Sequence, residues 1–552
     1  MTRTRSWASL AVFATASPLY LITGWLVTAG HGYLMGDALS RVSAAQAALF
    51  SRDPHLSAIG FVFTPLTALA QLPAVALSPL LPGLTTWGLS GVLMTALFMG
   101  GAVTTVHGIG TDRGAPAWLT LAVTVLFALN PMIVFYGGNG MSEALFLFCL
   151  CWAIRRLMRW VRTDGAHDLT ACGIALGLGY LTRYDALAPA AAAGAFVGAY
   201  TLWRRRGEAR RWWAAAMDVC LVLAPVGLAF FVWAATSWLI TGQAFQQFTS
   251  QYGNTAILEQ SGATAAGDSV AALEYSVAAM LVLGPALPLL VPVAGALGVR
   301  RRDLQVLVPM LLCGAVLAFQ TLSYATGSTF AFLRFYIAAI PLVAVLTLLL
   351  APARGQPPSR RLGEHAAAVP MPRAVPVAAL VATVLVLAAS LPLTTLGMNS
   401  SRLAVQEYAL GAVLFPRPDN ASERYADQRR IAATFTTGRK LARYLDSLRL
   451  PPGAVLMDTV YGFSVVVASE RPDQFVVPSD RDFVRILNRP AERGVRYILA
   501  VPPTGRGASD AVNRRYPTMF ENGAQIATLE LEVPADGASE PDWRLYRVLG
   551  AR

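Results

Sequence analysis

The chain has 552 residues, of which 55% are hydrophobic and 14% charged, and its formal charge is +12. Its mean hydropathy is +0.50. Repeated apolar runs of about 20 residues exclude an ordinary soluble protein and indicate a polytopic α-helical membrane protein. The arginines gather in short clusters between these runs, so we interpret them as topology signals and predict no nucleic-acid partner.

Eleven apolar runs are predicted to cross the membrane, and if all of them cross, every arginine cluster falls on one side. Basic residues favour the cytoplasmic side, so we predict a multi-pass cell-membrane protein with a cytoplasmic N-terminus and an extracytoplasmic C-terminus. The runs are 8–29, 85–108, 116–136, 141–160, 169–184, 186–203, 213–240, 275–298, 305–325, 330–351 and 374–396.

The first outer loop, residues 30–84, contains the segment "HGYLMGDALSRVSAAQAALFSRDPHLSAIGFVFTPL" (31–66). Its later part, 54–82, is apolar but holds four prolines, and a crossing there would reverse the side of every later arginine cluster. We therefore predict interfacial or re-entrant helices on the outer surface.

Beyond the last run the composition changes, and this change divides the chain into a membrane domain (1–396) and an extracytoplasmic domain (397–552). Segments 454–460, 474–479 and 496–503 have the pattern of buried strands, and 480–494 has that of a helix, which together predict a small α/β domain. Residues 352–373 are predicted to form a cytoplasmic connector. Residues 241–254 either cover an acceptor site or form a plain surface loop.

Ionisable residues at membrane depth are costly unless they face a cavity or a partner. Those outside the arginine clusters come from four distant parts of the chain but fall on one side at similar depth, so we predict that they share one site. They are Asp37, Asp53 and His55 in the first outer loop, Glu143 at the fourth run, Arg183 and Asp185 between the fifth and sixth, and Arg334 in the tenth.

Two arginines and two acids at the outer leaflet suit a phosphate-linked substrate. Guanidinium groups match phosphate geometry, so Arg183 and Arg334 are expected to bind a lipid phosphate. Asp37 could take the proton of an acceptor hydroxyl. A departing phosphate needs charge stabilisation more than protonation. These residues favour a lipid-phosphate donor that carries a sugar.

The chain resembles the GT-C superfamily of integral membrane glycosyltransferases, and within it the branch of protein O-mannosyltransferases and lipid A aminoarabinose transferases. The resemblance covers residues 1–396 and lies in the order and sidedness of Asp37, of the helical loop "DALSRVSAAQAALFSRDPHLSAIGFVFTPL" and of three further segments. It differs from that branch at Asp37-Ala38, where Asp-Glu is common. The segments are "NPMIVFYGGNGMSEALFLF", "GLGYLTRYDALAP" and "LRFYIAAIPL".

The resemblance implies that Asp37 is catalytic and that Arg334 contacts the donor phosphate. It implies a polyprenyl-phosphate sugar donor within the membrane lipid and an extracytoplasmic acceptor, either a cell-envelope glycan, a lipid or a protein. We expect a single displacement with inversion, with Asp37 as base. Two rivals are a flippase of lipid-linked sugars and an oligosaccharide polymerase or ligase.

Each candidate also has a structural alternative. Asp37 could cap a helix, Glu143 could be a first-turn residue, Arg183 and Asp185 could form an interfacial ion pair, and Arg334 could extend to lipid headgroups. Tyr136, Tyr184 and Tyr336 suit an interfacial aromatic belt or sugar stacking. Asp53 and His55 could bind a divalent cation, Mg²⁺ or Mn²⁺, with Asp37, or form a capping turn.

Overall fold

The computed structural model describes residues 2–246, 250, 258, 269–352, 375–417 and 419–550. Residues 353–373 of the predicted connector and half of the loop 241–254 lie outside the described residues. All eleven predicted runs contain helix. They are α1 (Thr2–Trp25), α5 (Leu89–Arg113), α6 (Ala117–Ala128) with α7 (Pro131–Gly137), α8 (Glu143–Thr163), α9 (Ala166–Tyr180), α10 (Leu187–Arg204), α11 (Arg211–Thr241), α14 (Ser269–Leu283) with α15 (Leu287–Arg301), α16 (Leu307–Ala325), α17 (Ala339–Leu350) and α18 (Val377–Met398).

Within the described residues, seven helices are long and apolar enough to cross a membrane, or nine if the bent pairs α6/α7 and α14/α15 each form one span. The two remaining predicted spans are α8, which contains four arginines, and α9, which has 15 residues. The protein is thus a polytopic membrane protein, as predicted. α17 lies at the centre, where its apolar side chains are buried on all sides.

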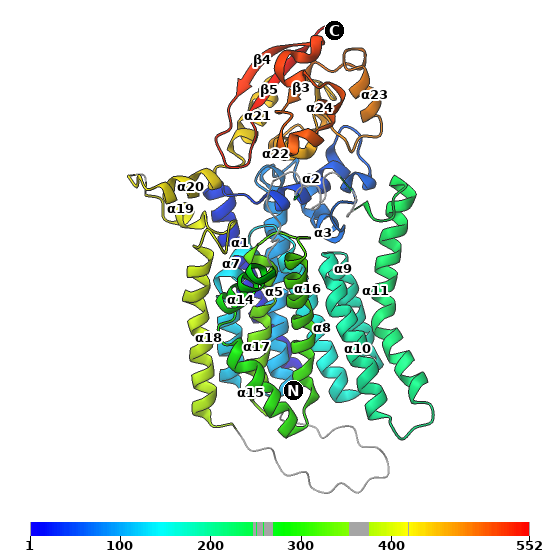
Figure 1. Ribbon diagram of the computed structural model, residues 1–552, viewed down its shortest axis with the longest axis vertical. Coiled ribbons are helices and arrows are strands. Elements are labelled where there is room, and N and C mark those ends of the chain that lie inside the picture. The colour runs from blue at the N-terminus through cyan, green and yellow to red at the C-terminus, as the bar shows by residue number, and fades with distance from the viewer. Residues whose placement is uncertain are drawn as a thin grey trace.

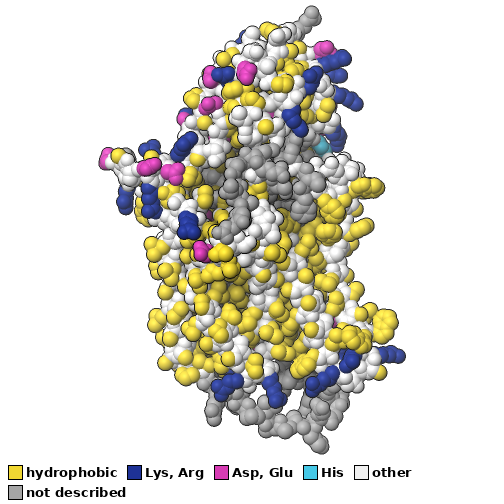
Figure 2. Space-filling view, viewed as in Figure 1, with side chains coloured by type: hydrophobic (Ala, Val, Ile, Leu, Met, Phe, Trp, Pro, Cys, Tyr) yellow, Lys and Arg dark blue, Asp and Glu magenta, His cyan; other side chains and the backbone are white. Residues whose placement is uncertain are grey.

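Arginine side chains of the described residues gather at one end of the bundle, shown in dark blue at the bottom of Figure 2. Ion pairs between separate elements confirm that these ends meet. Arg113 of α5 pairs with Asp303 beyond α15 at 2.5 Å, and Arg204 of α10 pairs with Asp164 beyond α8 at 3.0 Å. We call this the arginine end of the bundle.

The first loop, residues 31–88, lies at the opposite end, between the bundle and the C-terminal domain (Figure 1). It contains α2 (Gly36–Phe50), α3 (Leu66–Val75) and α4 (Gly83–Thr86). α3 is too short to cross a membrane at about 1.5 Å per residue. The prediction that 54–82 does not cross is therefore confirmed.

The C-terminal domain is built on a five-stranded sheet of order β2-β1-β3-β5-β4, in which β2, β1 and β3 are parallel and β5 and β4 antiparallel. The three parallel strands are the predicted ones, and β4 and β5 were not predicted. The strands are β1 (Val455–Leu456), β2 (Phe475–Val476), β3 (Tyr497–Ala500), β4 (Ala527–Val533) and β5 (Trp543–Val548).

Alternate strand residues enter two separate cores, so helices cover both faces of the sheet. Val455 packs with α21 (Thr436–Ser447) and α22 (Thr459–Ala468), whereas Leu456 packs with α23 (Phe483–Asn488) and α24 (Ala511–Arg515). Two short helices, α19 (Leu410–Leu414) and α20 (Glu423–Ala432), precede them, and α25 (Met519–Asn522) follows. Residues 404–413 pack in the core of the membrane helices, and the division at residue 396 stays a prediction.

Candidate functional site

Asp37 and Arg334, separated by 297 positions, form an ion pair at the end of the bundle that carries the first loop. Asp37 stands in the first turn of α2, and Arg334 stands in a 3₁₀ turn, Leu333–Tyr336, that leads into α17. The distance from Arg334 Nη2 to Asp37 Oδ2 is 2.9 Å. The Asp37 side chain is 39% exposed and that of Arg334 is 4% exposed. Arg334 is therefore buried and ion-paired, and the reading of it as a residue that reaches for headgroups is wrong.

Glu143 connects Arg334 to Arg183. Its Oε1 atom lies 2.8 Å from Arg183 Nη1 and 3.5 Å from Arg334 Nε. Arg183 also pairs with Asp185 at 2.8 Å, and Asp185 accepts a hydrogen bond from Gln320 Nε2 at 2.6 Å. The predicted convergence of Asp37, Glu143, Arg183, Asp185 and Arg334 is thus seen in the structure.

Arg41 adds a third guanidinium that the sequence did not mark as a site residue. It donates to the backbone oxygen of Asp37 at 2.8 Å and stacks on Phe63. Its Nε atom is buried and has no hydrogen-bond partner among the described residues. A buried donor without a partner is costly, and an anionic ligand could satisfy it. The spacing Asp37-x-x-x-Arg41 places both side chains on one face of α2. This spacing could have identified Arg41 as a site residue from the sequence.

We call Asp37, Arg41, Glu143, Arg183, Asp185 and Arg334 the charge cluster. Burial raises the pKa of Asp37, but the charges of Arg334 and Arg41 and the hydrogen bond from Arg334 outweigh it, so its pKa lies below the ordinary value. Burial lowers the pKa of Arg41, which the charges of Asp37 and Glu143 oppose. Asp37 is therefore ionised at neutral pH.

Some structural alternatives are settled by these contacts. Asp37 does not cap α2, because Met35 is the N-cap residue. Glu143 does occupy the first turn of α8 and is 1% exposed. Tyr136 and Tyr336 are buried, so they do not form an aromatic belt against lipid. Their hydroxyls contact Glu407 at 2.5 Å and Ser276 at 2.6 Å.

Asp53 and His55 do not join the charge cluster. α2 spans 15 residues and rises about 1.5 Å per residue, which separates Asp37 from the far end of the helix by about 20 Å. There Asp53 accepts a hydrogen bond from the backbone N–H of Arg481 at 3.0 Å, and His55 Nδ1 contacts the backbone oxygen of Asp53 at 2.6 Å.

This placement does not fit the predicted cation site of Asp37, Asp53 and His55. Within the described ranges, no group of three or more His, Cys, Asp or Glu side chains is arranged to hold a metal ion. Asp53 instead helps to attach the C-terminal domain.

The fold and the charge cluster define a class: a polytopic α-helical membrane protein with a small C-terminal α/β domain and an ion-paired polar site at the bundle end beside that domain. Among solved structures, the chain is similar to ArnT from Cupriavidus metallidurans bound to undecaprenyl phosphate, with a TM-score of 0.51 and 13% identity, over 98% of this chain and 97% of that one. This likeness confirms the predicted GT-C fold.

A second solved structure is the archaeal oligosaccharyltransferase AglB from Archaeoglobus fulgidus in complex with an inhibitory peptide and a dolichol-phosphate. It has a TM-score of 0.40 and 11% identity, over 90% of this chain and 70% of that one. No family model matches the chain, and neither does a curated protein.

Proposed function

We propose that the protein is a membrane glycosyltransferase that moves a monosaccharide from a polyprenyl phosphate to an extracytoplasmic glycan, lipid or protein. The observation that carries this proposal is the charge cluster, in which buried guanidinium groups surround one partly exposed carboxylate. The fold supports it, because the similar ArnT structure is bound to undecaprenyl phosphate. Arginine is well suited to a phosphate whose negative charge grows as it leaves.

In the proposed reaction, the oxygen of an acceptor hydroxyl attacks the anomeric carbon of the sugar while the bond from that carbon to the phosphate oxygen breaks. Attack opposite the leaving group inverts the anomeric configuration. Asp37 accepts the hydroxyl proton, and polyprenyl phosphate leaves with the bonding electron pair. Arg334 and Arg41 stabilise its charge.

The ion pair of Asp37 with Arg334 gives the donor a second role. A carboxylate held by a guanidinium is a weak base, because the positive charge lowers its pKa. A donor phosphate that binds Arg334 weakens the ion pair between Arg334 and Asp37, and this raises the proton affinity of Asp37. Asp37 would then become a better base only when a donor is bound.

Arg183 stands differently, because Glu143 and Asp185 already hold it. We propose that Arg183 positions Arg334, because both arginines contact Glu143. For Arg183 to contact the phosphate directly, as predicted, the donor would have to compete with Glu143 and Asp185. The proposed orientation has the arginine end in the cytoplasm, and the C-terminal domain and charge cluster outside.

Transfer by purified protein in nanodiscs tests the proposal, with a panel of radiolabelled polyprenyl-phosphate monosaccharides and a cell-envelope extract as acceptor. We expect the parent to transfer one of these sugars and Asp37→Asn to lose about 10²–10⁴-fold in rate, the usual contribution of a general base. Asp53→Asn is the matched control, since Asp53 lies on the same loop but apart from the cluster, and it should retain transfer.

Three results would contradict the proposal. Equal transfer by the parent and Asp37→Asn would remove Asp37 as the base. Transfer only from an oligosaccharyl pyrophosphate, added beside the monosaccharide panel, would favour a polymerase or ligase. Donor that crosses the bilayer of proteoliposomes made with the parent, without any transfer, would favour a flippase.

A further inference from the structure

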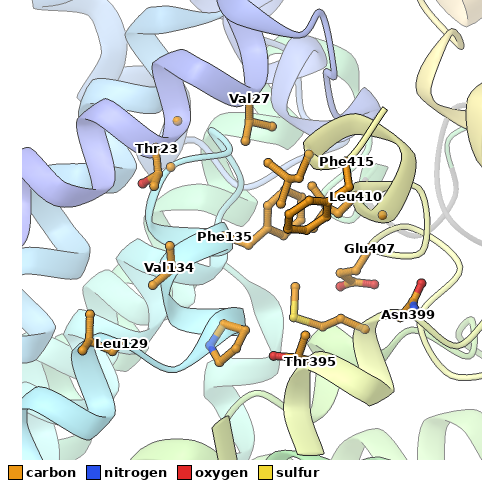
Figure 3. A pocket seen from close by; sticks show the side chains of 16 residues that line it. Thr23, Val27, Leu129, Val134, Phe135, Thr395, Asn399, Glu407, Leu410 and Phe415 are labelled. Atoms are coloured by element: carbon orange, nitrogen blue, oxygen red, sulfur yellow. The ribbon is translucent and has the colours of Figure 1, made fainter. Parts of the chain in front are cut away.

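A cavity of about 430 Å³ lies beside the charge cluster, at the same end of the bundle. α1, α7, α18 and α19 enclose it, and Figure 3 shows Val27, Val134, Phe135 and Leu410 among its mostly apolar lining. Its volume is within the range of pockets that bind small molecules. The charge-cluster residues do not line it.

The cavity opens on the apolar surface of the bundle. Leu129 and Phe415 both line it and are 47% and 69% exposed. The outer face of α18 next to it is also apolar, because Leu393 and Leu396 are exposed there. A molecule can therefore enter from the surrounding lipid without crossing a polar surface.

One carboxyl group lies in this mostly apolar lining. Glu407 lines the cavity and accepts a hydrogen bond from Tyr136 at 2.5 Å. Burial raises the pKa of Glu407, which the hydrogen bond from Tyr136 and the charge of Arg334 only partly oppose. Because the charges of Arg334 and Glu143 act on Glu407, this end of the cavity lies next to the charge cluster.

The charge of the lining selects what can bind. None of the described residues around the cavity is Arg, Lys or His, and Glu407 is acidic. A phosphate headgroup there would meet the Glu407 carboxyl group, and no arginine, lysine or histidine among the lining residues could pair with it. A hydroxyl group, in contrast, can donate a hydrogen bond to Glu407. Phosphate and hydroxyl ligands are thus directed to different places, the arginines of the charge cluster and the cavity.

We propose that the cavity binds the apolar chain of a lipid acceptor whose uncharged, hydroxyl-bearing end contacts Glu407 and extends from there to Asp37. This inference rests on the proposed function and selects a lipid from its three acceptor classes. The donor phosphate binds at the arginines, and the acceptor enters from the membrane on the side of α18.

Photolabelling of the full-length protein in nanodiscs tests this site without requiring transfer. The probes are a hexadecanol and a hexadecyl phosphate that carry the same diazirine in the chain. We expect the alcohol to label residues of the cavity. Thr395→Trp, which fills the cavity from α18, should reduce this labelling by about tenfold or more, because a bulky ring displaces several methylene contacts.

Leu385→Trp is the matched control, since Leu385 lies on the same helix, is 65% exposed and does not line the cavity. It should leave the labelling unchanged. Val27→Phe fills the cavity from the helical turn Leu26–Gly30, which follows α1, and provides a second test if Thr395→Trp misfolds. Glu407→Leu should remove the preference for hexadecanol over its methyl ether, which has no hydroxyl to donate.

Two results would overturn the inference. Alcohol labelling that survives both filling variants would place the alcohol elsewhere. Hexadecyl phosphate that labels the cavity as strongly as the alcohol would make it a site for the donor chain or for ordinary phospholipid. Failure of the proposed function would be seen separately, as a parent protein that transfers no sugar in the nanodisc assay.

Discussion

Arg41 is held differently from the other guanidinium groups of the charge cluster. Arg183 contacts two carboxylates, whereas Arg41 donates to a backbone oxygen at 2.8 Å and lies 3.4 Å from the Ser142 hydroxyl. Its charge is therefore offset mainly by the nearby carboxylates of Asp37 and Glu143. An incoming phosphate does not have to displace an ion-paired carboxylate to reach Arg41.

This difference predicts that Arg41→Lys weakens donor binding more than it slows the chemistry. Lysine keeps the charge but loses the planar fork and the stacking on Phe63. We expect the KM for the polyprenyl-phosphate donor to rise about tenfold or more, the loss of one charge-assisted hydrogen bond, with a smaller change in kcat. Steady-state kinetics with the donor found active would measure both. A reduced kcat with unchanged KM would contradict a role in donor binding.

At the scale of elements, α1 packs against the turn after α7 through two glycines. A Cβ atom on Gly24 would lie 2.3 Å from the backbone oxygen of Gly138 and 2.5 Å from Val92 Cγ1. Because one of these atoms belongs to the backbone, a rotamer change cannot relieve the overlap. The close approach holds the outer part of α1 against the segment that leads to Glu143.

We expect Gly24→Ala to lower the free energy of unfolding by about 1–3 kcal/mol, the usual cost of overpacking. Thermal unfolding in detergent, followed by tryptophan fluorescence, should show a lower Tm. Gly227→Ala is the control, because Gly227 also lies in a membrane helix and has open space around its Cβ position. Equal Tm values for the two variants would show that the close contact does not matter.

Element order and sidedness were predictable from the sequence, because apolar runs and arginine clusters follow from the cost of placing charges in lipid. The same reasoning found Asp37, Glu143 and Arg334, whose charges stand out against apolar neighbours. It missed Glu407, which follows α18 in a turn segment without periodicity. It also assigned Asp53 to the site, because Asp53 is close to Asp37 in the sequence. In the structure the 15-residue helix α2 carries the chain away from Asp37 before Asp53 is reached.

At the scale of the whole molecule, the C-terminal domain is attached to the first loop by ion pairs. Arg52 follows α2 and contacts Asp480 at 3.1 Å and also Asp482. Asp480 is fully buried. Arg439 of α21 stacks on Trp87 at the other side of the loop. The domain is thus connected to the same helix, α2, that carries Asp37.

Arg52→Ala should therefore loosen the domain from the first loop. It leaves the buried carboxylate of Asp480 without its cation, at a cost of about 1–3 kcal/mol or more. We expect faster hydrogen–deuterium exchange in α2 and α22, which pack against each other. Arg489→Ala is the control, because its pair with Glu492 is exposed on both sides and should contribute little. Unchanged exchange in Arg52→Ala would show that other contacts hold the domain.

The C-terminal domain also contains carboxyl groups whose titration links its stability to pH. Asp510 is 3% exposed, and burial, followed by the charge of Asp458, raises its pKa from 3.8 to about 7. Burial raises the pKa of Glu540 from 4.5 to about 8. A raised carboxyl pKa means that the folded state favours the protonated form. The stabilisation is complete below the unfolded pKa and is lost as pH rises through the folded pKa.

The free energy of unfolding of the domain should therefore fall between about pH 4 and pH 8, by at most about 1.4 kcal/mol per pH unit for each group. Pulse proteolysis in urea, with the domain fragment followed by mass, would measure this slope in the full-length protein. Asp510→Asn should reduce the fall in the free energy of unfolding between pH 4 and pH 7. The remaining pH dependence, which is due to Glu540, should be retained. Glu492→Gln, at an exposed position in the same domain, should leave the slope as it is. A domain that becomes more stable from pH 5 to pH 8 would contradict the assignment, because it would require carboxyl groups whose pKa is lowered by folding to outweigh Asp510 and Glu540.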